Sequence, residues 1–524
     1  MDTRTEADLS FLSVLEHHAA RTPDQPLAVY GDRTVTYQGM VDWAAALAAG
    51  LQARGVAAGD VVGLLSYNST EFLATIFAAN HLGAVAMPVN WRLAAPELRF
   101  ILEHSEARAL VCDADLVDLA NAATDPPVPG LVRLRAGDRA ADGSAAGWEH
   151  FDDLVGDHPP VPRARLAGDA VHRLMYTSGT TGRPKGVMIT HENLAWKNYA
   201  HVTELGFTAD DVGLACGPLY HVGALDLVTT SMLAVGATTV VHRTFDAQQV
   251  VDEIERSRIT VIWAAPAMVR AMLDVAGIEQ RDLSSVRLII AGGEKMPVPV
   301  IERIHRTFPS AWFADAYGLT ETVSGDTFLD RANTIAKLGS VGRPCPYLEL
   351  ELWDERGAPV PANERGEVVL RGPKVFPGYW RDPDATATAF AGGWFHTGDI
   401  GVLDDDGYLY IVDRLKDMIV SGGENIASSE VERVLYEHPA VVEVAVVGRP
   451  DQRWGEVPVA YVVLAPDATD ATDATVTPEQ LIELCRAQLA KFKVPREVTV
   501  IDALPRNPSG KVLKRELRLS GDGQ

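Results

Sequence analysis

Short apolar runs and helix-like patterns alternate along the first part of the chain. Residues 61–66, 85–88 and 109–112 have the continuous apolar character of buried strands. Residues 71–79, between the first two of these runs, have apolar positions at helical spacing. Such alternation predicts a largely parallel sheet covered by helices. We expect a polar stretch rich in Pro, Gly and Asp, residues 124–157, to form surface loops.

Two later apolar runs, residues 260–266 and 288–293, end in small residues. Because ligands of α/β sheets bind beyond the carboxyl ends of strands, we expect both ends to form pocket walls. Residues 214–241 are also strongly apolar, but they include His221 and Asp226, which would be costly in a bilayer. We therefore expect this stretch to be buried core rather than a membrane span.

The pattern changes after Gly339, where short strand-like segments and tight turns follow one another. Residues 366–371 and 407–412 are examples, and they predict a smaller β-rich subdomain.

The last part of the chain, beyond Asp413, has an α+β pattern. A helix is expected at 428–437 and strands near 441–447 and 457–464, which together predict a separate C-terminal domain. Within it, residues 468–475 form a small Ala-Thr-Asp repeat that we interpret as a solvated loop.

Composition and charge narrow the functional classes. A chain of 524 residues with 47% hydrophobic and 23% charged residues is typical of a soluble globular protein with at least two domains. The formal net charge of −24 disfavours general binding of nucleic acid. The four cysteines are far apart and fit neither a disulfide framework nor a metal site, and acidic residues occupy the start of the chain. Both features favour a cytoplasmic location.

A loop suited to polyphosphate binding spans residues 175–186. It contains three glycines, several hydroxyl side chains and Lys185, so it offers backbone N–H groups, hydroxyl donors and one cation. It does not match the G-x-x-x-x-G-K-[ST] pattern, which disfavours a kinase or an ordinary ATPase. By itself the segment also fits a flexible surface turn.

Five segments share their residue types and order with known family motifs: 176–186, 317–321, 393–399, 413–417 and 505–511. Together they resemble the adenylate-forming superfamily, which includes acyl-CoA synthetases, firefly-type luciferases and adenylation domains of peptide synthetases. The resemblance is strongest to acyl-CoA ligases of the fatty-acyl-CoA-synthetase type. It implies an α/β fold with a large N-terminal domain of layered, mostly parallel sheets and helices plus a β-rich subdomain. A small, mobile α+β C-terminal domain follows, with implied boundaries at 1–412, 413–416 (hinge) and 417–524.

The resemblance implies a site for ATP and Mg²⁺. Asp315 and Tyr317 are expected to bind adenine, Thr320 phosphate and Glu321 the metal, since one carboxylate plus phosphate oxygens suffices for magnesium. Lys185 is expected to hold the departing pyrophosphate. The other implied nucleotide-contacting positions are Thr177, Ser178, Gly179, Thr180, Thr181, Gly182, Gly292, Gly293, Gly318, Asp399 and Arg414. Taken alone, Thr320 and Glu321 also fit a helix N-cap followed by an acidic first turn.

The resemblance also assigns roles in the mobile domain. Lys416 marks the hinge, and Gly422 and Gly423 belong to the segment that lines the pantetheine tunnel of CoA. Lys511 enters the active site and stabilises the charge that develops on the α-phosphate and the substrate carboxylate. The local sequence around Lys511 also fits a basic C-terminal tail.

The resemblance places the acyl site around His221, Gly223, Trp263 and Gly325, together with Gly292 and Gly293. The small residues in these segments suggest open space and hence a hydrophobic, medium-to-long or bulky carboxylic acid. His221 equally fits a packed core histidine.

The function implied is that of an acyl-CoA synthetase, which forms an acyl-adenylate from the acid and ATP and transfers the acyl group to CoA. Alternatives remain: loading of a carrier protein, use of one half-reaction alone, an oxidative luciferase-like reaction, and nucleotide binding without catalysis. The sequence leaves open whether the chain forms a homodimer.

Overall fold

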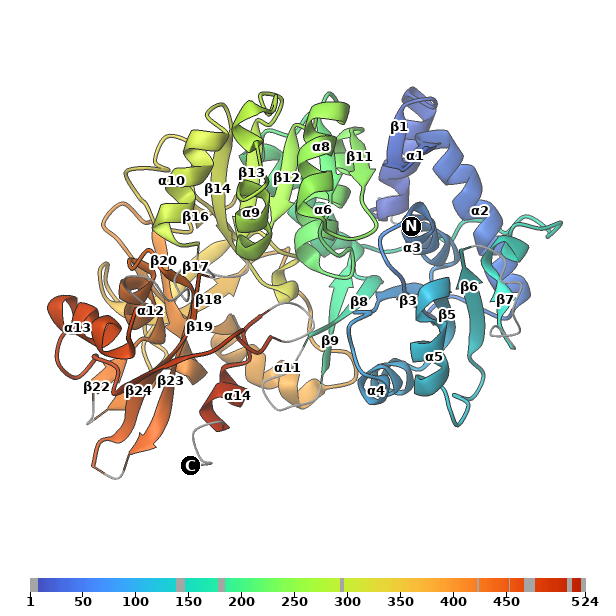
Figure 1. Ribbon diagram of the computed structural model, residues 1–524. Helices are drawn as coiled ribbons and strands as arrows, with labels where there is room; N and C mark the ends of the chain where they lie inside the picture. Colours follow the sequence, from blue (N-terminus) through green and yellow to red (C-terminus); the bar gives the residue numbers. More distant parts are fainter. Residues whose placement is uncertain are drawn as a thin grey trace.

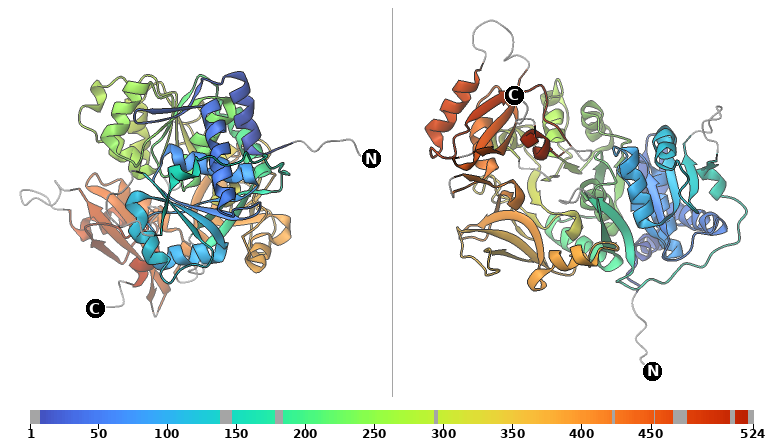
Figure 2. Two further views of the ribbon diagram at one scale, coloured as in Figure 1. Left: turned by 90° about the vertical axis from the view of Figure 1, so that its right-hand side faces the viewer. Right: turned by 90° about the horizontal axis from the view of Figure 1, so that it is seen from below.

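The computed structural model describes residues 8–137, 147–177, 184–292, 296–421, 424–451, 453–465, 476–506 and 511–519. The described residues form four sheets, and Figures 1 and 2 show how these are arranged. The C-terminal domain and a four-stranded sheet lie at one end, and a seven-stranded sheet lies at the other.

The seven-stranded sheet is parallel except for the β8/β9 pair. Its strands, in spatial order, are β7 (Glu149–His150), β6 (Val132–Ala136), β5 (Ala107–Asp113), β3 (Val61–Leu65), β4 (Val85–Pro88), β8 (Val171–Thr177) and β9 (Lys185–Thr190). The first five helices accompany this half: α1 (Phe11–Arg21), α2 (Tyr37–Ala53), α3 (Thr70–Leu82), α4 (Ala95–Ser105) and α5 (Val117–Ala123).

One expectation for this region is wrong. The stretch 124–157 contains strands β6 and β7 and a 3₁₀ turn, Phe151–Leu154, in addition to loops. Leu134 and Leu154 are fully buried, because β6 extends the parallel sheet beside β5 and the 3₁₀ turn packs against α2. Residues 138–146 of this stretch lie outside the described part of the chain.

The nine-stranded sheet has a parallel centre and antiparallel edges. Its strands, in spatial order, are β16 (Arg343–Pro344), β15 (Thr327–Phe328), β14 (Trp312–Tyr317), β13 (Leu288–Gly292), β12 (Val261–Ala264), β10 (Val212–Ala215), β11 (Thr238–Val241), β1 (Pro26–Tyr30) and β2 (Arg33–Thr36). The remaining helices of this half are α6 (His191–Leu205), a π-helical segment (Gly223–Thr229), α7 (Thr230–Val235), α8 (Ala247–Ser257), α9 (Pro266–Leu273) and α10 (Val298–Thr307).

The apolar stretch 214–241 is almost wholly buried core, as expected. Its one acidic residue, Asp226, is fully buried because Arg173 from β8 pairs with it at 2.5 Å. Lys197 of α6, also fully buried, donates to the Asp226 backbone oxygen at 2.6 Å. This polar cluster therefore ties β8 of the seven-stranded sheet to α6 and to the π-helical segment, which packs against β10 and β12 of the nine-stranded sheet.

The expected β-rich subdomain is an antiparallel sheet of four strands, β17 (Glu349–Trp353), β18 (Arg365–Arg371), β19 (Phe395–Leu403) and β20 (Leu409–Arg414), with helix α11 (Pro383–Ala389). The C-terminal domain has strands β21 (Ile419–Ser421), β22 (Glu424–Ile426), β23 (Val441–Asp451), β24 (Gly455–Leu464) and β25 (Glu497–Val500) and helices α12 (Ser428–Tyr436), α13 (Pro478–Gln488) and α14 (Lys514–Leu519). The helix and both strands expected here are present. The 468–475 repeat lies outside the described residues.

Polar contacts join the C-terminal domain to the rest of the molecule. Glu443 of β23 pairs with Arg270 of α9 at 3.5 Å, and Glu430 of α12 pairs with Arg365 of β18. The carboxylate of Asp413, at the end of β20, accepts a hydrogen bond from the Ser428 N–H at 2.7 Å and so caps the start of α12. Within the described residues, no helix is long and apolar enough to cross a membrane.

Candidate active site

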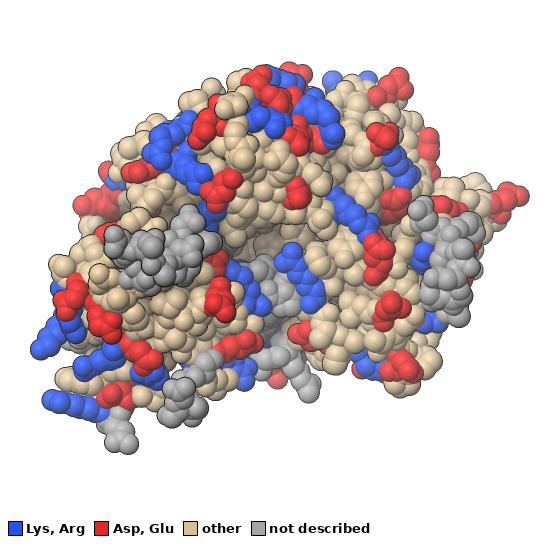
Figure 3. All heavy atoms as spheres, viewed as in Figure 1, with Lys and Arg blue, Asp and Glu red and all other residues tan. Residues whose placement is uncertain are grey.

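The carboxyl ends of three neighbouring strands define the floor of the site. Strands β12, β13 and β14 are parallel neighbours, and they end at Ala264, Gly292 and Tyr317. The ends of β12 and β13 are those expected from the sequence to form pocket walls. Figure 3 shows a hollow in the middle of the molecular face, between the C-terminal domain and the opposite half, with basic side chains at its rim.

The turn after β14 carries Gly318, Thr320 and Glu321. Thr320–Thr322 forms one 3₁₀ turn, and the next three residues, Val323–Gly325, all have left-handed backbones with φ between 56° and 65°. The chain thereby folds back so closely that a Cβ on Gly318 would lie 2.4 Å from the backbone nitrogen of Gly325. Gly318 is therefore required by the close approach of two backbone segments.

Glu321 is held from two sides by the segment after β18. Its backbone oxygen accepts from the Phe376 N–H at 2.8 Å, and its carboxylate accepts from the Tyr379 hydroxyl at 3.0 Å. Burial raises the pKa of the Glu321 carboxyl, and hydrogen bonds and the cations Lys511 and Arg414 act against that rise. A divalent cation would stabilise the charged form of so desolvated a carboxylate, so Glu321 fits the single-carboxylate type of magnesium site.

Tyr379 also links Glu321 to Lys185. The Lys185 Nζ lies 4.8 Å from the centre of the Tyr379 ring, whose hydroxyl contacts Glu321. Lys185 pairs with Thr177 where the β8/β9 hairpin opens into the glycine-rich loop. The expected loop positions Ser178, Gly179, Thr180, Thr181 and Gly182 lie outside the described residues.

Three expected nucleotide-binding residues meet on the other side of the site. The Tyr317 hydroxyl donates to Asp399 at 2.8 Å, and the Arg414 Nε lies 3.2 Å from the other Asp399 oxygen. Asp399 and Arg414 are directly opposed on β19 and β20. Burial and the charge of Asp399 raise the pKa of the Tyr317 hydroxyl. Asp315, two residues before Tyr317, is buried within β14.

His221 belongs to the packed wall of the site and also lies within electrostatic reach of Lys511. Its ring stacks on Trp263, with centroids 6.0 Å apart, and its Nδ1 accepts from the Gly223 N–H at 3.1 Å. Burial, together with the positive charge of Lys511, lowers the pKa of His221 to about 4. His221 is therefore neutral at neutral pH. Since Lys511 acts on both His221 and Glu321, the C-terminal segment reaches into the site.

The small residues of the expected acyl site do not simply leave open space. A Cβ on Gly223 would lie 2.3 Å from the Trp263 ring, and one on Gly325 would lie 2.6 Å from His201 and Phe328. A Cβ on Gly292 would lie 2.4 Å from the backbone oxygen of Ala316. The inference from small residues to a roomy pocket is therefore wrong at these three positions, because protein atoms occupy the space.

Several expected positions fall outside what the structure describes, namely Gly293, Gly422, Gly423 and the side chain of Lys416. Conversely, sequence reasoning missed Tyr379 and Lys374, although both lie in the short Gly-Pro-Lys-Val-Phe-Pro-Gly-Tyr run after β18. Two prolines and two glycines directly after a strand were the available signal, because they mark a segment of fixed shape.

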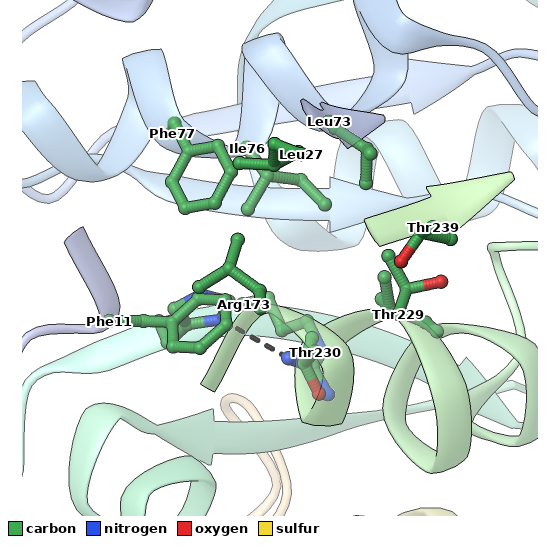
Figure 4. A pocket seen from close by; sticks show the side chains of 12 residues that line it. Phe11, Leu27, Leu73, Ile76, Phe77, Arg173, Thr229, Thr230 and Thr239 are labelled. Carbon is green, nitrogen blue, oxygen red and sulfur yellow. Dashed lines mark hydrogen bonds between the residues drawn. The ribbon is translucent and has the colours of Figure 1, made fainter. Parts of the chain in front are cut away.

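A separate internal cavity of about 20 Å³ lies between residues such as Phe11, Leu73, Phe77 and Thr230 (Figure 4). None of its lining residues belongs to the candidate site. Its volume suits about one water molecule and is too small for an acyl group.

Comparisons with known proteins agree with this arrangement. A feruloyl-CoA synthase of Amycolatopsis sp is 39% identical over 501 residues, covering 95% of this chain and 96% of the relative. A long-chain-fatty-acid–CoA ligase of Mycobacterium tuberculosis is 39% identical over 490 residues, covering 93% of each. The structure of O-succinylbenzoate coenzyme A synthetase from Bacillus subtilis in complex with ATP and magnesium ion has a TM-score of 0.85 at 32% identity, covering 96% of this chain and 98% of that one.

Family models describe the same two parts of the chain. Residues 430–511 match the C-terminal domain of AMP-binding enzymes, and residues 15–380 match the AMP-binding enzyme model itself. With that match covering more than half of its length, the chain belongs to the AMP-binding enzyme family.

Proposed function

We propose that this enzyme is an AMP-forming acid–thiol ligase that activates a hydrophobic, medium-to-long or bulky carboxylic acid with ATP and transfers the acyl group to CoA. The observation that carries the proposal is the convergence of Glu321, the Tyr317–Asp399–Arg414 cluster and Lys511 on one hollow. The relatives support it, including the size of the acid, since their names specify a feruloyl-CoA synthase and a CoA ligase for long-chain fatty acids.

In the first step, a carboxylate oxygen of the acid attacks the α-phosphorus of ATP and the bond to pyrophosphate breaks. Lys511 stabilises the negative charge that develops there, and Lys185 holds the departing pyrophosphate. Asp399 and Arg414 hold the ribose, and the Tyr317 ring lies against adenine. Magnesium, held by Glu321, would neutralise phosphate charge during this step. Neutral His221 and Trp263 form an apolar wall beside the acid.

In the second step, the sulfur of CoA attacks the acyl carbonyl and AMP leaves. No enzyme nucleophile is needed, and the cysteines are unsuited to that role. All four are buried, and burial raises the pKa of Cys345 and of Cys485 to about 11.

We further propose that residues 417–524 rotate about a hinge at 413–416 between the two steps, which removes Lys511 and admits CoA. The polar character of the domain contact supports this. The Arg365–Glu430 and Arg270–Glu443 pairs are partly exposed, and pairs of this kind contribute only about 0–1 kcal/mol each. The contact can therefore be broken without opening a hydrophobic core.

The wall formed by Trp263 supports a hydrophobic acid. Trp263 is 5% exposed and its ring packs between Gly217 and Gly223, so the position of the ring is well defined. A rigid, flat, apolar wall favours an aryl or alkyl group over a charged one.

A pyrophosphate-release screen over fatty, aromatic and polycyclic acids, with and without CoA, tests the proposal. We expect release with at least one hydrophobic acid and a thioester product only when CoA is present. Absence of release with every acid would refute adenylation. Release followed by transfer to a carrier-protein thiol, with none to CoA, would identify a carrier-loading enzyme instead.

A further inference from the structure

A fully buried lysine, Lys374, lies against the turn that carries Glu321. Its Nζ donates to the backbone oxygens of Ser324 and Gly325 at 2.8 and 2.6 Å and to the Asp326 carboxylate at 2.9 Å. The side chains of Lys374 and Asp326 are 2% and 0% exposed. All three hydrogens of this ammonium group are thus donated to oxygens of the same turn.

The backbone that Lys374 holds is unfavourable by itself. Val323 and Ser324 have left-handed backbones, with φ of 56° and 65°, although neither is glycine. Such conformations persist where surrounding contacts enforce them, and they are concentrated at functional sites. Here the enforcing contacts include the bonds from Lys374 to the carbonyls at the end of the left-handed run, beside the contact of His201 with the Gly325 oxygen and the bond from the Ser324 N–H to the Leu319 oxygen.

The partner carboxylate connects this anchor to the site. Asp326 accepts a hydrogen bond from the Thr322 hydroxyl at 2.6 Å, and Thr322 directly follows Glu321. The Thr322 hydroxyl oxygen also accepts from the Leu319 N–H at 3.2 Å, which closes the turn from the other end. A short chain of contacts therefore runs from Lys374 through Asp326 and Thr322 to the residue beside Glu321.

The segment that supplies Lys374 also supplies the other supports of Glu321. Phe376 and Tyr379 bind the Glu321 backbone and carboxylate, respectively. Lys374 thus fixes the end of the turn, at Ser324 and Gly325, while Phe376 and Tyr379 fix Glu321 itself. The position of the carboxylate depends on both.

We propose that Lys374, through its buried pair with Asp326, is a positioning residue that holds the Glu321 carboxylate in place to bind magnesium with the phosphates of ATP. The inference rests on the proposed function, because it assigns Glu321 to the metal. Residues that orient a metal ligand typically change metal affinity or activity by about 10- to 100-fold when they are removed.

The chain offers a matched control, because Lys197 is also a fully buried lysine in the same core. It donates to the Asp226 backbone oxygen at 2.6 Å and to the Thr230 hydroxyl at 2.7 Å, and these bonds support α7 and the π-helical segment. Within the described part of the chain, the hydrogen bonds donated by the Lys197 Nζ do not reach the turn 319–326. Lys197→Met and Lys374→Met therefore make the same chemical change at two buried sites of one core, of which only Lys374 is hydrogen-bonded to the turn.

The first readout requires no acid and no turnover. The melting temperature of the full-length chain is measured with ATP alone and with ATP plus increasing Mg²⁺. We expect the Mg²⁺ concentration for half-maximal stabilisation to rise about 10- to 100-fold in Lys374→Met and to stay within about threefold of wild type in Lys197→Met. If this Mg²⁺ concentration were the same in Lys374→Met as in Lys197→Met, the role of Lys374 would be merely structural and the proposal would be overturned.

The second readout is pyrophosphate release with a saturating acid. We expect Lys374→Met to lower kcat and raise the Mg²⁺ requirement with little change in the KM of the acid. If the wild-type chain releases no pyrophosphate with any acid, the proposed function fails, whereas the thermal readout still decides the role of Lys374. Should Lys374→Met not fold, Asp326→Asn tests the same pair, because the amide keeps the shape and removes the charge. A wild-type Mg²⁺ midpoint in Asp326→Asn would likewise overturn the proposal.

Discussion

Gly223→Ala tests directly whether Trp263 sets the shape of the acyl site. The added methyl group would lie 2.3 to 2.7 Å from three atoms of the six-membered ring of the indole, so that the ring must move. It cannot move freely, because its other edge already fills the space that a side chain at Gly217 would take and so packs against the backbone there. Overpacking of this kind costs about 1–3 kcal/mol of folding free energy. We therefore expect a lower melting temperature and a higher KM for the acid, with a smaller change in the KM of ATP.

Trp263→Phe supplies the compensating change, since a phenyl ring lacks the indole atoms that the new methyl group would meet. The double variant should be more stable than the sum of the single effects predicts, by about 0.5–3 kcal/mol. Its pocket should also accept bulkier acids better than wild type does, which competition between a short and a bulky acid measures as a ratio of kcat/KM values. Gly156→Ala is the control, because Gly156 is exposed and its nearest neighbour is the flexible side chain of His158. If Gly223→Ala matched this control in melting temperature and in acid KM, the assignment of Trp263 as the wall would be refuted.

The remaining predictions concern charge and protonation. Lys511→Ala should reduce adenylation by about 10²–10³-fold yet retain much of the CoA transfer from a synthetic acyl-adenylate; equal loss of both steps would contradict domain rotation. Tyr379→Phe should leave the melting temperature nearly unchanged and lower the rate of pyrophosphate release by about tenfold, because the Glu321 carboxylate loses its hydroxyl donor. Because the folded-state pKa of His221 is lowered to about 4, its contribution to stability is complete above about pH 6.5 and is lost as the pH falls towards 4. His221→Gln should therefore flatten the decline of melting temperature over that range, and an unchanged slope would argue against the shift.

The sequence predicted the elements whose burial is continuous. Strands β3, β12 and β13 are fully buried, and their apolar runs are unbroken by charge. Strand β6 was missed because only Leu134 and Ala136 of it are buried, and because Arg133 and Arg135 alternate with its apolar residues within a turn-rich stretch. The alternation itself is typical of a half-buried strand, so a signal was present but weak.

The residues of the site also fall into those that the sequence predicted and those that it did not. Glu321, Asp399 and Lys511 belong to motifs with recognisable neighbours, whereas Tyr379 acts on a residue 58 positions away and Lys374 on one 48 positions away. Contacts over such separations are set by tertiary packing, which no local pattern reports. The glycines illustrate the same limit, because the absence of a side chain does not reveal which atoms take its place.

The ion pairs between the C-terminal domain and the rest of the chain make the domain contact sensitive to ionic strength. At about 0.15 M salt the screening length is near 8 Å, and at 1 M it is near 3 Å, so partly exposed pairs weaken progressively as salt is added. Arg270–Glu443 and Arg365–Glu430 stabilise the domain orientation of this structure, in which Lys511 lies within electrostatic reach of Glu321 and His221. In the proposed rotation, added salt would therefore slow the first half-reaction mildly without slowing the second. Under that proposal, turnover numbers measured in different buffers would reflect different proportions of the two orientations.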